Sequence, residues 1–441
     1  MSNDRYSPAP ARGAYRAPES GSPVHASVTV PGSKSLTNRE LMIAAIADGP
    51  GRLLRPLHSD DSRRMIEALR LLGVGIEEVP SDGEFGPDLL VTPAHLTGGT
   101  TIDCGQAGTV MRFIAPLAGL AAEDVHLTAD ENALHRPMGT LITALRDLGV
   151  DVDDEGTWSL PFTVRGRGRI RGGRVEIDAS GSSQFVSGLL LAAPRFDVGL
   201  HLVHTGEHLP SLPHIDMTIE SLSRRGIRIE RPAVGEWLVE AGVPRAKDVA
   251  IEPDLSNAAP FLGAAMLTGG EVSISGWPLH STQPGALLPE ILHAMGAHTG
   301  RHAGALTVRA GDGIRGLELD LSAASELTPT IAGLAAFADG PTTIRGVAHI
   351  RTHETDRISA LAGNLRALGG EVEELADGLR ITPRRLQGGS WPAHHDHRMA
   401  TTGALVGLRT PGVEIDDIGT TAKTLPEFTL LWERMLTGAT A

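Results

Sequence analysis

The feature that most constrains the fold of this 441-residue sequence is a segment that recurs at intervals of 69 to 77 residues. Each copy is a leucine-rich stretch that ends at a glycine, and most copies continue into residues of alternating polarity. This pattern predicts an amphipathic helix that ends at a glycine C-cap and leads into a strand. The six glycines are Gly73, Gly149, Gly226, Gly296, Gly369 and, in a degenerate copy, Gly438.

A second series of six segments alternates with the first at intervals of 70 to 74 residues. These segments are rich in Ala and Leu on nearly all helical faces, so we expect buried helices. They start near Ser35, Gly108, Ser182, Ser256, Glu326 and His397. Together the two series predict an α/β protein made of six copies of one unit. On spacing alone, a solenoid and an α/β barrel remain alternatives.

Composition narrows the functional classes. Hydrophobic residues make up 41% of the chain, and no apolar run approaches the ~18 residues that a membrane span needs. The net charge of −14 argues against nucleic acid or anionic membrane as the main partner. A single cysteine excludes an intramolecular disulfide and favours a cytoplasmic location. The first 21 residues, rich in Pro, Ala, Ser and Gly, are expected to form a mobile tail before a strand at residues 25–30.

The expected starts of the buried helices are candidate anion sites, because free backbone N–H groups and the helix dipole favour negative charge there. The first start carries Ser33, Lys34, Ser35 and, on the same face, Arg39. The second start places Gly105 and Gly108 around Gln106-Ala107, followed by Arg112, which we expect to support the loop. Its Cys104 is interpreted as packed rather than reactive. The third start offers Ser182, Ser183 and Gln184, which form either a neutral donor set or only an N-cap.

The later helix starts add acids and further cations. Glu326 is interpreted as a helix cap or a general base. The run of four potential metal ligands at 394–397 suggests zinc, but adjacent residues cannot all face one ion, so Arg398 as a ligand-binding arginine is preferred. Cations with acids nearby indicate a small polyanionic substrate and proton transfer. The candidate set is Lys34, Arg39, Arg136, Arg357, Arg398 and Lys423 with the acids Glu326 and Glu354.

The motifs resemble those of one family, the 5-enolpyruvylshikimate-3-phosphate synthases, over residues 23–435. Several exchanges resemble those of actinobacterial members. The matching segments are 31–39 (PGSKSLTNR), 104–113 (CGQAGTVMRF), 136–141 (RPMGTL), 182–191 (SSQFVSGLLL), 254–258 (DLSNA), 353–357 (HETDR), 396–400 (DHRMA) and 423–428 (KTLPEF).

The resemblance implies a two-domain fold of six βαβαββ units, an inside-out α/β barrel. One domain would comprise 22–32 plus 252–441, the other 33–251, with the active site in the cleft between them. It also implies a cytoplasmic, monomeric transferase of the shikimate pathway that makes aromatic amino acids and chorismate, with no cofactor and no metal.

The implied reaction is addition–elimination, in which shikimate 3-phosphate receives the enolpyruvyl group of phosphoenolpyruvate and phosphate is released. By the resemblance, Glu326, Glu354 and Lys34 are catalytic, with Glu326 as base and Glu354 as acid. Shikimate 3-phosphate would contact Lys34, Ser35, Arg39, Ser182, Ser183, Gln184, Ser211, Glu326 and His353. Phosphoenolpyruvate would contact Lys34, Gly108, Arg136, Gln184, Arg357, Arg398 and Lys423.

The sequence departs from the usual family pattern at several positions. Gln106 replaces asparagine, Glu326 aspartate, His353 lysine, His214 tyrosine and His349 asparagine. The role of His353 is left open, because imidazole titrates near neutrality. Two alternatives remain: a UDP-N-acetylglucosamine enolpyruvyl transferase of the same architecture, and a non-catalytic anion-binding relative. The first would carry a loop cysteine and a different first motif, and the second would be expected to lose the acids or arginines.

Overall fold

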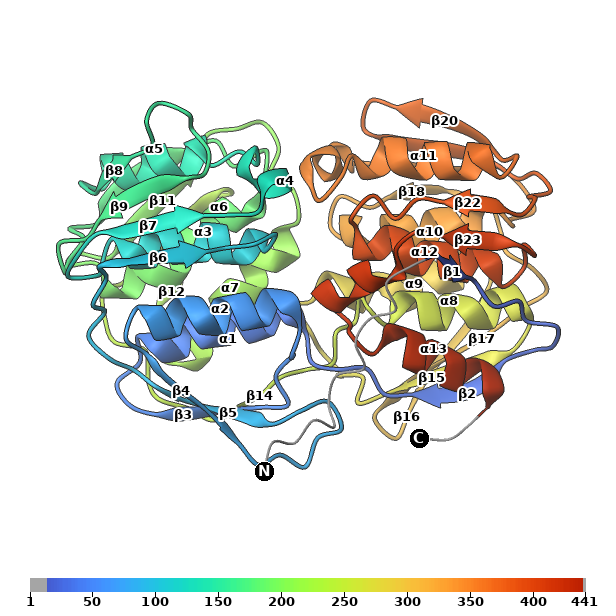
Figure 1. The fold of residues 1–441 in the computed structure, drawn as a ribbon, viewed down its shortest axis with the longest axis horizontal. Helices are drawn as coiled ribbons and strands as arrows, with labels where there is room; N and C mark the ends of the chain where they lie inside the picture. The colour runs from blue at the N-terminus through green and yellow to red at the C-terminus, as the bar shows by residue number, and fades with distance from the viewer. Residues whose placement is uncertain (1–13, 439–441) are drawn as a thin grey trace. The chain divides into compact units, whose positions relative to one another are not determined.

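The computed structural model describes residues 14–438, and the chain divides into two compact units. Unit 1 consists of Met1–Pro31 and Glu252–Ala441, and unit 2 is Gly32–Ile251. Figure 1 shows that each unit is built from helices and short strands.

Unit 2 contains the first three helices of each of the two predicted series. Its helices are α1 (Lys34–Ala45), α2 (Asp60–Leu71), α3 (Gly108–Ala118), α4 (Glu131–Leu134), α5 (Gly139–Asp147), α6 (Ser183–Ala192), the 3-10 helix η1 (Ala193–Arg195) and α7 (Leu212–Arg224). Its strands are β3 (Gly51–Leu54), β4 (Gly75–Val79), β5 (Asp88–Thr92), β6 (Thr100–Asp103), β7 (Val125–Thr128), β8 (Asp151–Asp153), β9 (Phe162–Arg165), β10 (Gly173–Ile177), β11 (Leu200–His204), β12 (Ile229–Glu230), β13 (Glu236–Val239) and β14 (Val249–Ala250).

Unit 1 repeats the same plan. Its helices are α8 (Ala259–Thr268), η2 (Pro284–Leu287), α9 (Leu288–Ala294), η3 (Ser325–Leu327), α10 (Thr328–Ala335), η4 (Ala348–Thr352), α11 (Arg357–Ala367), α12 (His397–Gly407), η5 (Ile418–Lys423) and α13 (Phe428–Thr437). Its strands are β1 (Tyr15–Arg16), β2 (His25–Val28), β15 (Glu271–Ser275), β16 (His298–His302), β17 (Ala305–Arg309), β18 (Glu318–Asp320), β19 (Thr342–Arg345), β20 (Glu371–Leu375), β21 (Gly378–Thr382), β22 (Gly389–Trp391) and β23 (Val413–Ile415).

Within residues 14–438, five of the six sheets share one topology. Five have four strands each, in the orders β14-β3-β5-β4, β6-β7-β9-β8, β10-β11-β13-β12, β2-β15-β17-β16 and β18-β19-β21-β20. In each, the first pair is parallel and the later pairs are antiparallel, as in β10, β11 and β13. A strand, a buried helix, the parallel strand, a surface helix and a hairpin therefore form the predicted βαβαββ unit. In the first unit of each half, the leading strand comes from a distant segment, β14 or β2.

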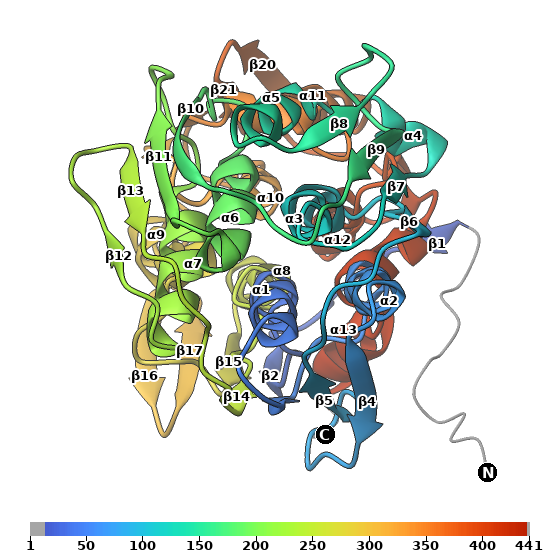
Figure 2. The ribbon, with the colours of Figure 1, turned by 90° about the vertical axis from the view of Figure 1, so that its left-hand side faces the viewer.

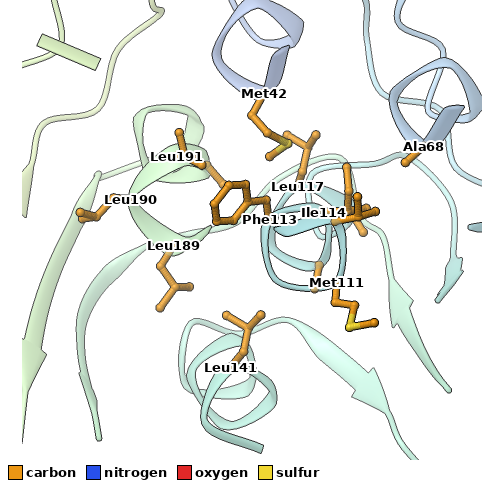
Figure 3. Close-up of a cluster of buried hydrophobic side chains, with 14 of the residues drawn as sticks. Met42, Ala68, Met111, Phe113, Ile114, Leu117, Leu141, Leu189, Leu190 and Leu191 are labelled. Carbon is orange, nitrogen blue, oxygen red and sulfur yellow. The ribbon is translucent and has the colours of Figure 1, made fainter. Parts of the chain in front are cut away.

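The inner helices of unit 2 are α1, α3 and α6, seen nearly end-on in Figure 2. Every residue from Thr109 to Ala118 in α3 is buried, which confirms a helix that is apolar on most faces. Figure 3 shows Phe113 of α3 among Met42 of α1 and the leucines of α6. Their close packing excludes water from the middle of unit 2 and fixes the depth of each helix.

The glycines of the surface-helix series all have a left-handed backbone, with φ between 67° and 107°. A side chain at such a position would strain the backbone, so glycine ends each helix and redirects the chain. For the first five copies a strand follows, as predicted. Any strand after Gly438 would lie outside the described residues.

The prediction that residues 1–21 form a mobile tail is wrong for the second half of that segment. Residues 1–13 lie outside the described part of the chain, but Tyr15 and Arg16 form β1, which pairs antiparallel with β23. Ala17 then donates its N–H to Val413 at 3.0 Å and is buried. The strand forms because the sixth sheet, β1-β23-β22, has no hairpin of its own and an open edge accepts another strand. Among the described helices none is long and apolar enough to cross a membrane.

Candidate active site

The starts of α1, α3 and α6 lie at one end of unit 2. Asn38, in the second turn of α1, donates to Thr109 at the start of α3 over 2.7 Å. Arg39 donates to Ser187 in α6 over 3.3 Å. The first turns of α1 therefore contact the first turns of α3 and α6. The free N–H groups and the positive dipole ends of the three helices thus lie at the same end of the unit.

A polar cluster surrounds Gly108 at the start of α3. A Cβ atom built on Gly108 would lie 2.9 Å from Nη1 of Arg112, 3.3 Å from Oε1 of Gln184 and 3.6 Å from Nη1 of Arg136. Arg112 donates to Oε1 of Gln184 over 2.8 Å, and Arg136 donates to the carbonyl of Gln106 over 2.9 Å. Arg112 thus holds the side chain of Gln184 in α6 and directs the amide nitrogen of Gln184 away from itself. Its predicted support of the loop before α3 stays a prediction. We call Gly108, Arg112, Arg136 and Gln184 the unit 2 cluster.

Lys34 begins α1 and is held by a carboxylate that the sequence did not single out. Its Nζ lies 3.2 Å from Oδ2 of Asp61, which is in the first turn of α2 and 4% exposed. The preceding residue, Ser33, caps α1 by accepting the N–H of Leu36. The cap fixes where α1 begins, and the ion pair fixes the position of the charge of Lys34.

Arg39 is almost completely buried and links three helices. Its guanidinium donates to Thr218 and to the carbonyl of His214, both in α7, and to Ser187 in α6. It also donates to the carbonyl of Ser35, one turn earlier in α1. The structure therefore assigns Arg39 a role in fixing α1 and α7. Its predicted contact with substrate stays a prediction.

The serines predicted in unit 2 have distinct surroundings. Ser182 caps α6 by accepting the N–H of Gln184, and Ser183 is buried in the first turn. Ser182 is therefore an N-cap residue, and a ligand contact of this run stays a prediction. Ser211 precedes α7 with a left-handed φ of 54°, a strained conformation for a residue with a side chain.

The acid Glu326 lies in η3, just before α10 of unit 1. It accepts a hydrogen bond from Ser256, which lies shortly before α8, and its Oε1 is 3.7 Å from Nη2 of Arg398 in α12. Contacts from the starts of three buried helices thus meet at one carboxylate, whose side chain is 18% exposed. That exposure leaves the carboxylate accessible to a small molecule.

The second acid, Glu354, is held by two cations. Its Oε2 accepts from Nη2 of Arg357 over 2.9 Å and its Oε1 accepts from Nζ of Lys423 over 2.5 Å. Arg357 also donates to both oxygens of Asp396, over 2.7 and 3.2 Å, and Asp396 caps α12 by accepting the N–H of Arg398. We call this connected set the unit 1 network; its members are Ser256, Glu326, Glu354, Arg357, Asp396, Arg398 and Lys423.

Arg357 is the most deeply buried cation of the unit 1 network. Burial by itself lowers its pKa, but the charges of Asp396 and Glu354, the hydrogen bonds to Asp396 and the charge of Glu326 outweigh it and raise the pKa above its ordinary value. Arg357 therefore stays protonated at any pH at which the protein is folded. It is a fixed positive charge.

Two histidines adjoin the unit 1 network. Nδ1 of His353 lies 3.1 Å from Nη1 of Arg357, and the rings of His349 and His353 meet edge to face at 5.9 Å. Nε2 of His349 lies 2.8 Å from Oγ of Ser325, next to Glu326. The histidines thus connect the segments that carry the two acids.

Sequence reasoning missed Asp61, named Ser256 only as a helix start and quoted Asp396 only as part of a motif. Each anchors a predicted side chain, and two of them come from elements far away in the sequence. The one available signal was physical: a buried cation in a chain of charge −14 needs a carboxylate beside it.

Cys104 is fully buried, as the sequence predicted. Burial and the charge of Asp103 raise the pKa of its thiol well above its ordinary range, against a smaller opposing effect of Arg64. The thiol is therefore unreactive. Over residues 14–438, no three His, Cys, Asp or Glu side chains form a metal-binding group, and His394 and His395 have a left-handed backbone that turns the chain before α12.

The family model described as EPSP synthase (3-phosphoshikimate 1-carboxyvinyltransferase) matches residues 18–432. The chain belongs to the EPSP synthase family. A 3-phosphoshikimate 1-carboxyvinyltransferase of Kocuria rhizophila is 51% identical over 421 residues, which cover 94% of this chain and 95% of that protein.

Solved structures agree with the family assignment. An EPSP synthase from Acinetobacter baumannii has a TM-score of 0.80 and 25% identity, covering 97% of this chain and 99% of that one. The enolpyruvyl transferase NikO from Streptomyces tendae has a TM-score of 0.73 at 20% identity, covering 95% and 96%. NikO supports the fold alone. The EPSP synthase family thus accounts for the repeat architecture of the whole chain.

Proposed function

We propose that this chain is a 3-phosphoshikimate 1-carboxyvinyltransferase, which transfers the enolpyruvyl group of phosphoenolpyruvate to the 5-hydroxyl of shikimate 3-phosphate and releases phosphate. The observation that carries the proposal is the unit 1 network, where Arg357 and Lys423 hold the carboxylate of Glu354 and Arg398 lies beside that of Glu326. Two anionic substrates need fixed cations, and an addition to a double bond needs both a base and an acid.

In the addition step, Glu326 removes the hydroxyl proton of shikimate 3-phosphate. The oxygen forms a bond to the central carbon of phosphoenolpyruvate while Glu354, in its protonated form, donates a proton to the methylene carbon. The product is a tetrahedral intermediate. In the elimination step, the Glu354 carboxylate takes a proton back from the new methyl group as the carbon–carbon double bond re-forms. The phosphate departs with the electron pair of its C–O bond and takes up the proton held by Glu326.

The cations around Glu354 give this acid a defined role. Arg357 and Lys423 both donate to its carboxylate. An anionic substrate that binds these cations weakens their hold on the carboxylate, which can then take up the proton that it donates. Cations that fit the intermediate better than the substrates lower the barrier.

Unit 2 contributes the remaining predicted substrate contacts. Lys34, Arg136 and Gln184 present donors at the start of the inner helices, held by Asp61, Gln106 and Arg112 respectively. We propose these donors of unit 2, like the unit 1 network, as substrate contacts, and the proposed reaction needs no metal or cofactor.

The test is phosphate release from phosphoenolpyruvate in the presence of shikimate 3-phosphate, with each substrate also supplied alone. We expect release only with both. UDP-N-acetylglucosamine as acceptor should give none. A folded protein that releases no phosphate with both substrates would contradict the proposal.

Glu326→Gln should lower kcat by about 10²- to 10⁴-fold, because the amide cannot accept the hydroxyl proton. Binding of shikimate 3-phosphate, measured by calorimetry, should change far less. Glu318→Gln is the matched control, since Glu318 is exposed on β18 of the same unit. Full activity of the Glu326 variant would reject this residue as the base.

A further inference from the structure

The contact between Arg357 and His353 defines the protonation of the histidine. Nη1 of Arg357 lies 3.1 Å from Nδ1 of His353 with the N–H directed at it. A guanidinium has only donors, so Nδ1 must be the acceptor and carries no proton. His353 is therefore a neutral imidazole with its proton on Nε2.

The charges around His353 favour the same state. The nearest cation is Arg357 on α11, which is bound in turn to Glu354 and to Asp396 before α12. Lys423 of η5 holds Glu354, and Arg398 of α12 lies beside Glu326 of η3. The network balances three cations against three carboxylates. A second proton on His353 would place another positive charge beside Arg357 and would remove the acceptor of Nη1.

The ring of His353 also has a second neighbour. His349 packs edge to face against it and contacts Ser325, the residue before Glu326. The position of His353 therefore bears on Arg357 directly and on the η3 segment through His349. Nε2 of His349 and the hydroxyl of Ser325 can exchange donor and acceptor roles, so this contact tolerates either neutral tautomer of His349.

We propose that His353 is a positioning residue for Arg357 that works only as the neutral, Nε2-protonated imidazole, so that acidification releases one side of the guanidinium. Asp396 and Glu354 occupy Nε and Nη2, and His353 is the partner that orients Nη1. The consequence for turnover rests on the proposed function: the protonation of His353 governs the acid limb of kcat/KM for phosphoenolpyruvate.

The tautomer can be measured without turnover. Nitrogen-15 NMR of the histidine-labelled full chain, free of substrate, separates the two neutral tautomers and the imidazolium. His353→Gln identifies the signal by its loss. We expect an Nε2-protonated neutral ring at pH 7.5. An Nδ1-protonated ring or an imidazolium at that pH would overturn the proposal, whether or not the protein turns over these substrates.

Kinetics test the consequence through pH profiles of kcat/KM. Between pH 8 and 5.5 kcat/KM of the unmodified chain should fall as His353 takes up a second proton, because Nη1 of Arg357 then loses its acceptor. His353→Gln keeps an acceptor that does not titrate, so its loss of kcat/KM over the same pH range should be smaller. Titration of the substrates themselves affects both proteins equally.

Two further variants complete the test. His353→Lys cannot accept from Arg357 and adds a charge, so it should lower kcat/KM for phosphoenolpyruvate at pH 8 further than His353→Gln does. His302→Gln, on the exposed end of β16, should keep the unmodified pH profile. Parallel profiles for His353→Gln and the unmodified chain would refute the assigned role.

Discussion

At the residue scale, the cations of the unit 1 network are already paired. Lys423 contacts Glu354, Arg398 lies beside Glu326 and Arg357 contacts Asp396. Lys34 of unit 2 is paired with Asp61 in the same way. A chain of charge −14 can therefore hold anion-binding cations in fixed positions without an overall positive field. The proposed anionic substrates would therefore have to displace these carboxylates from their cations.

Asp396→Asn should destabilise unit 1 by about 3 kcal/mol, because it removes one carboxylate from a buried ion pair and leaves Arg357 with Glu354 as its remaining counter-charge. Urea unfolding followed by tryptophan fluorescence would measure the change. Glu371→Gln is the control, since its pair with Arg384 is more than half exposed and its loss should change stability by less than about 0.5 kcal/mol. Equal effects of the two substitutions would contradict this account.

At the element scale, the close approach of α3 and α6 positions the unit 2 cluster. Gly188 of α6 faces the backbone of Arg112 in α3, and a Cβ atom there would come within 2.3 Å of that residue's carbonyl oxygen. The two helices can approach this closely only because position 188 has no side chain. Since Arg112 contacts Gln184, the same glycine indirectly sets the orientation of a predicted substrate contact.

Gly188→Ala should therefore cost about 1 to 3 kcal/mol in unit 2 through overpacking. It should also raise KM for phosphoenolpyruvate by moving Arg112 and Gln184. Denaturant midpoints and steady-state kinetics measure the two effects. Gly363→Ala is the helical control: a Cβ atom at this exposed site in α11 meets nothing within 4 Å, so the substitution should stabilise by about 0.4 to 1 kcal/mol. If Gly188→Ala changed neither the denaturant midpoint nor KM, α3 and α6 would be able to move apart without cost, which would contradict this account.

At the scale of the whole molecule, the two units differ in how the chain forms them: unit 2 is continuous in sequence and unit 1 is not. Unit 2 is one continuous segment, and the hydrophobic core that includes Leu41 and Val239 lies entirely within it. Unit 1 is discontinuous, because β2 pairs with β15 and β1 pairs with β23 across more than two hundred residues. The start of the chain thus supplies an edge strand to each of two sheets in unit 1.

A fragment of residues 32–251 should therefore fold alone and unfold cooperatively in urea. A fragment of residues 252–441 should lack cooperative unfolding until a peptide of residues 14–31 is added, because two sheet edges are then covered again. Circular dichroism and urea titration with and without the peptide provide the measurement. Cooperative folding of 252–441 by itself, with an unchanged midpoint on adding peptide, would show that β1 and β2 are dispensable.

The sequence by itself determined the sixfold repeat, the buried inner helices and the glycines that end the outer ones. These features depend on short-range periodicity and on backbone conformations that only glycine adopts readily. It also indicated the helix starts where cations and acids occur, because N-terminal caps and charges are local signals.

Only the tertiary structure decided which groups hold one another. Asp61 reaches Lys34 from the next helix, Ser256 reaches Glu326 across 70 positions, and Asp396 reaches Arg357 across 39. The contact of His353 with Arg357 and the place of β1 likewise appear only once the helices and sheets are packed. Local patterns specify elements, whereas partners distant in sequence are chosen by burial, since a buried charge must find its counter-charge wherever the fold places it.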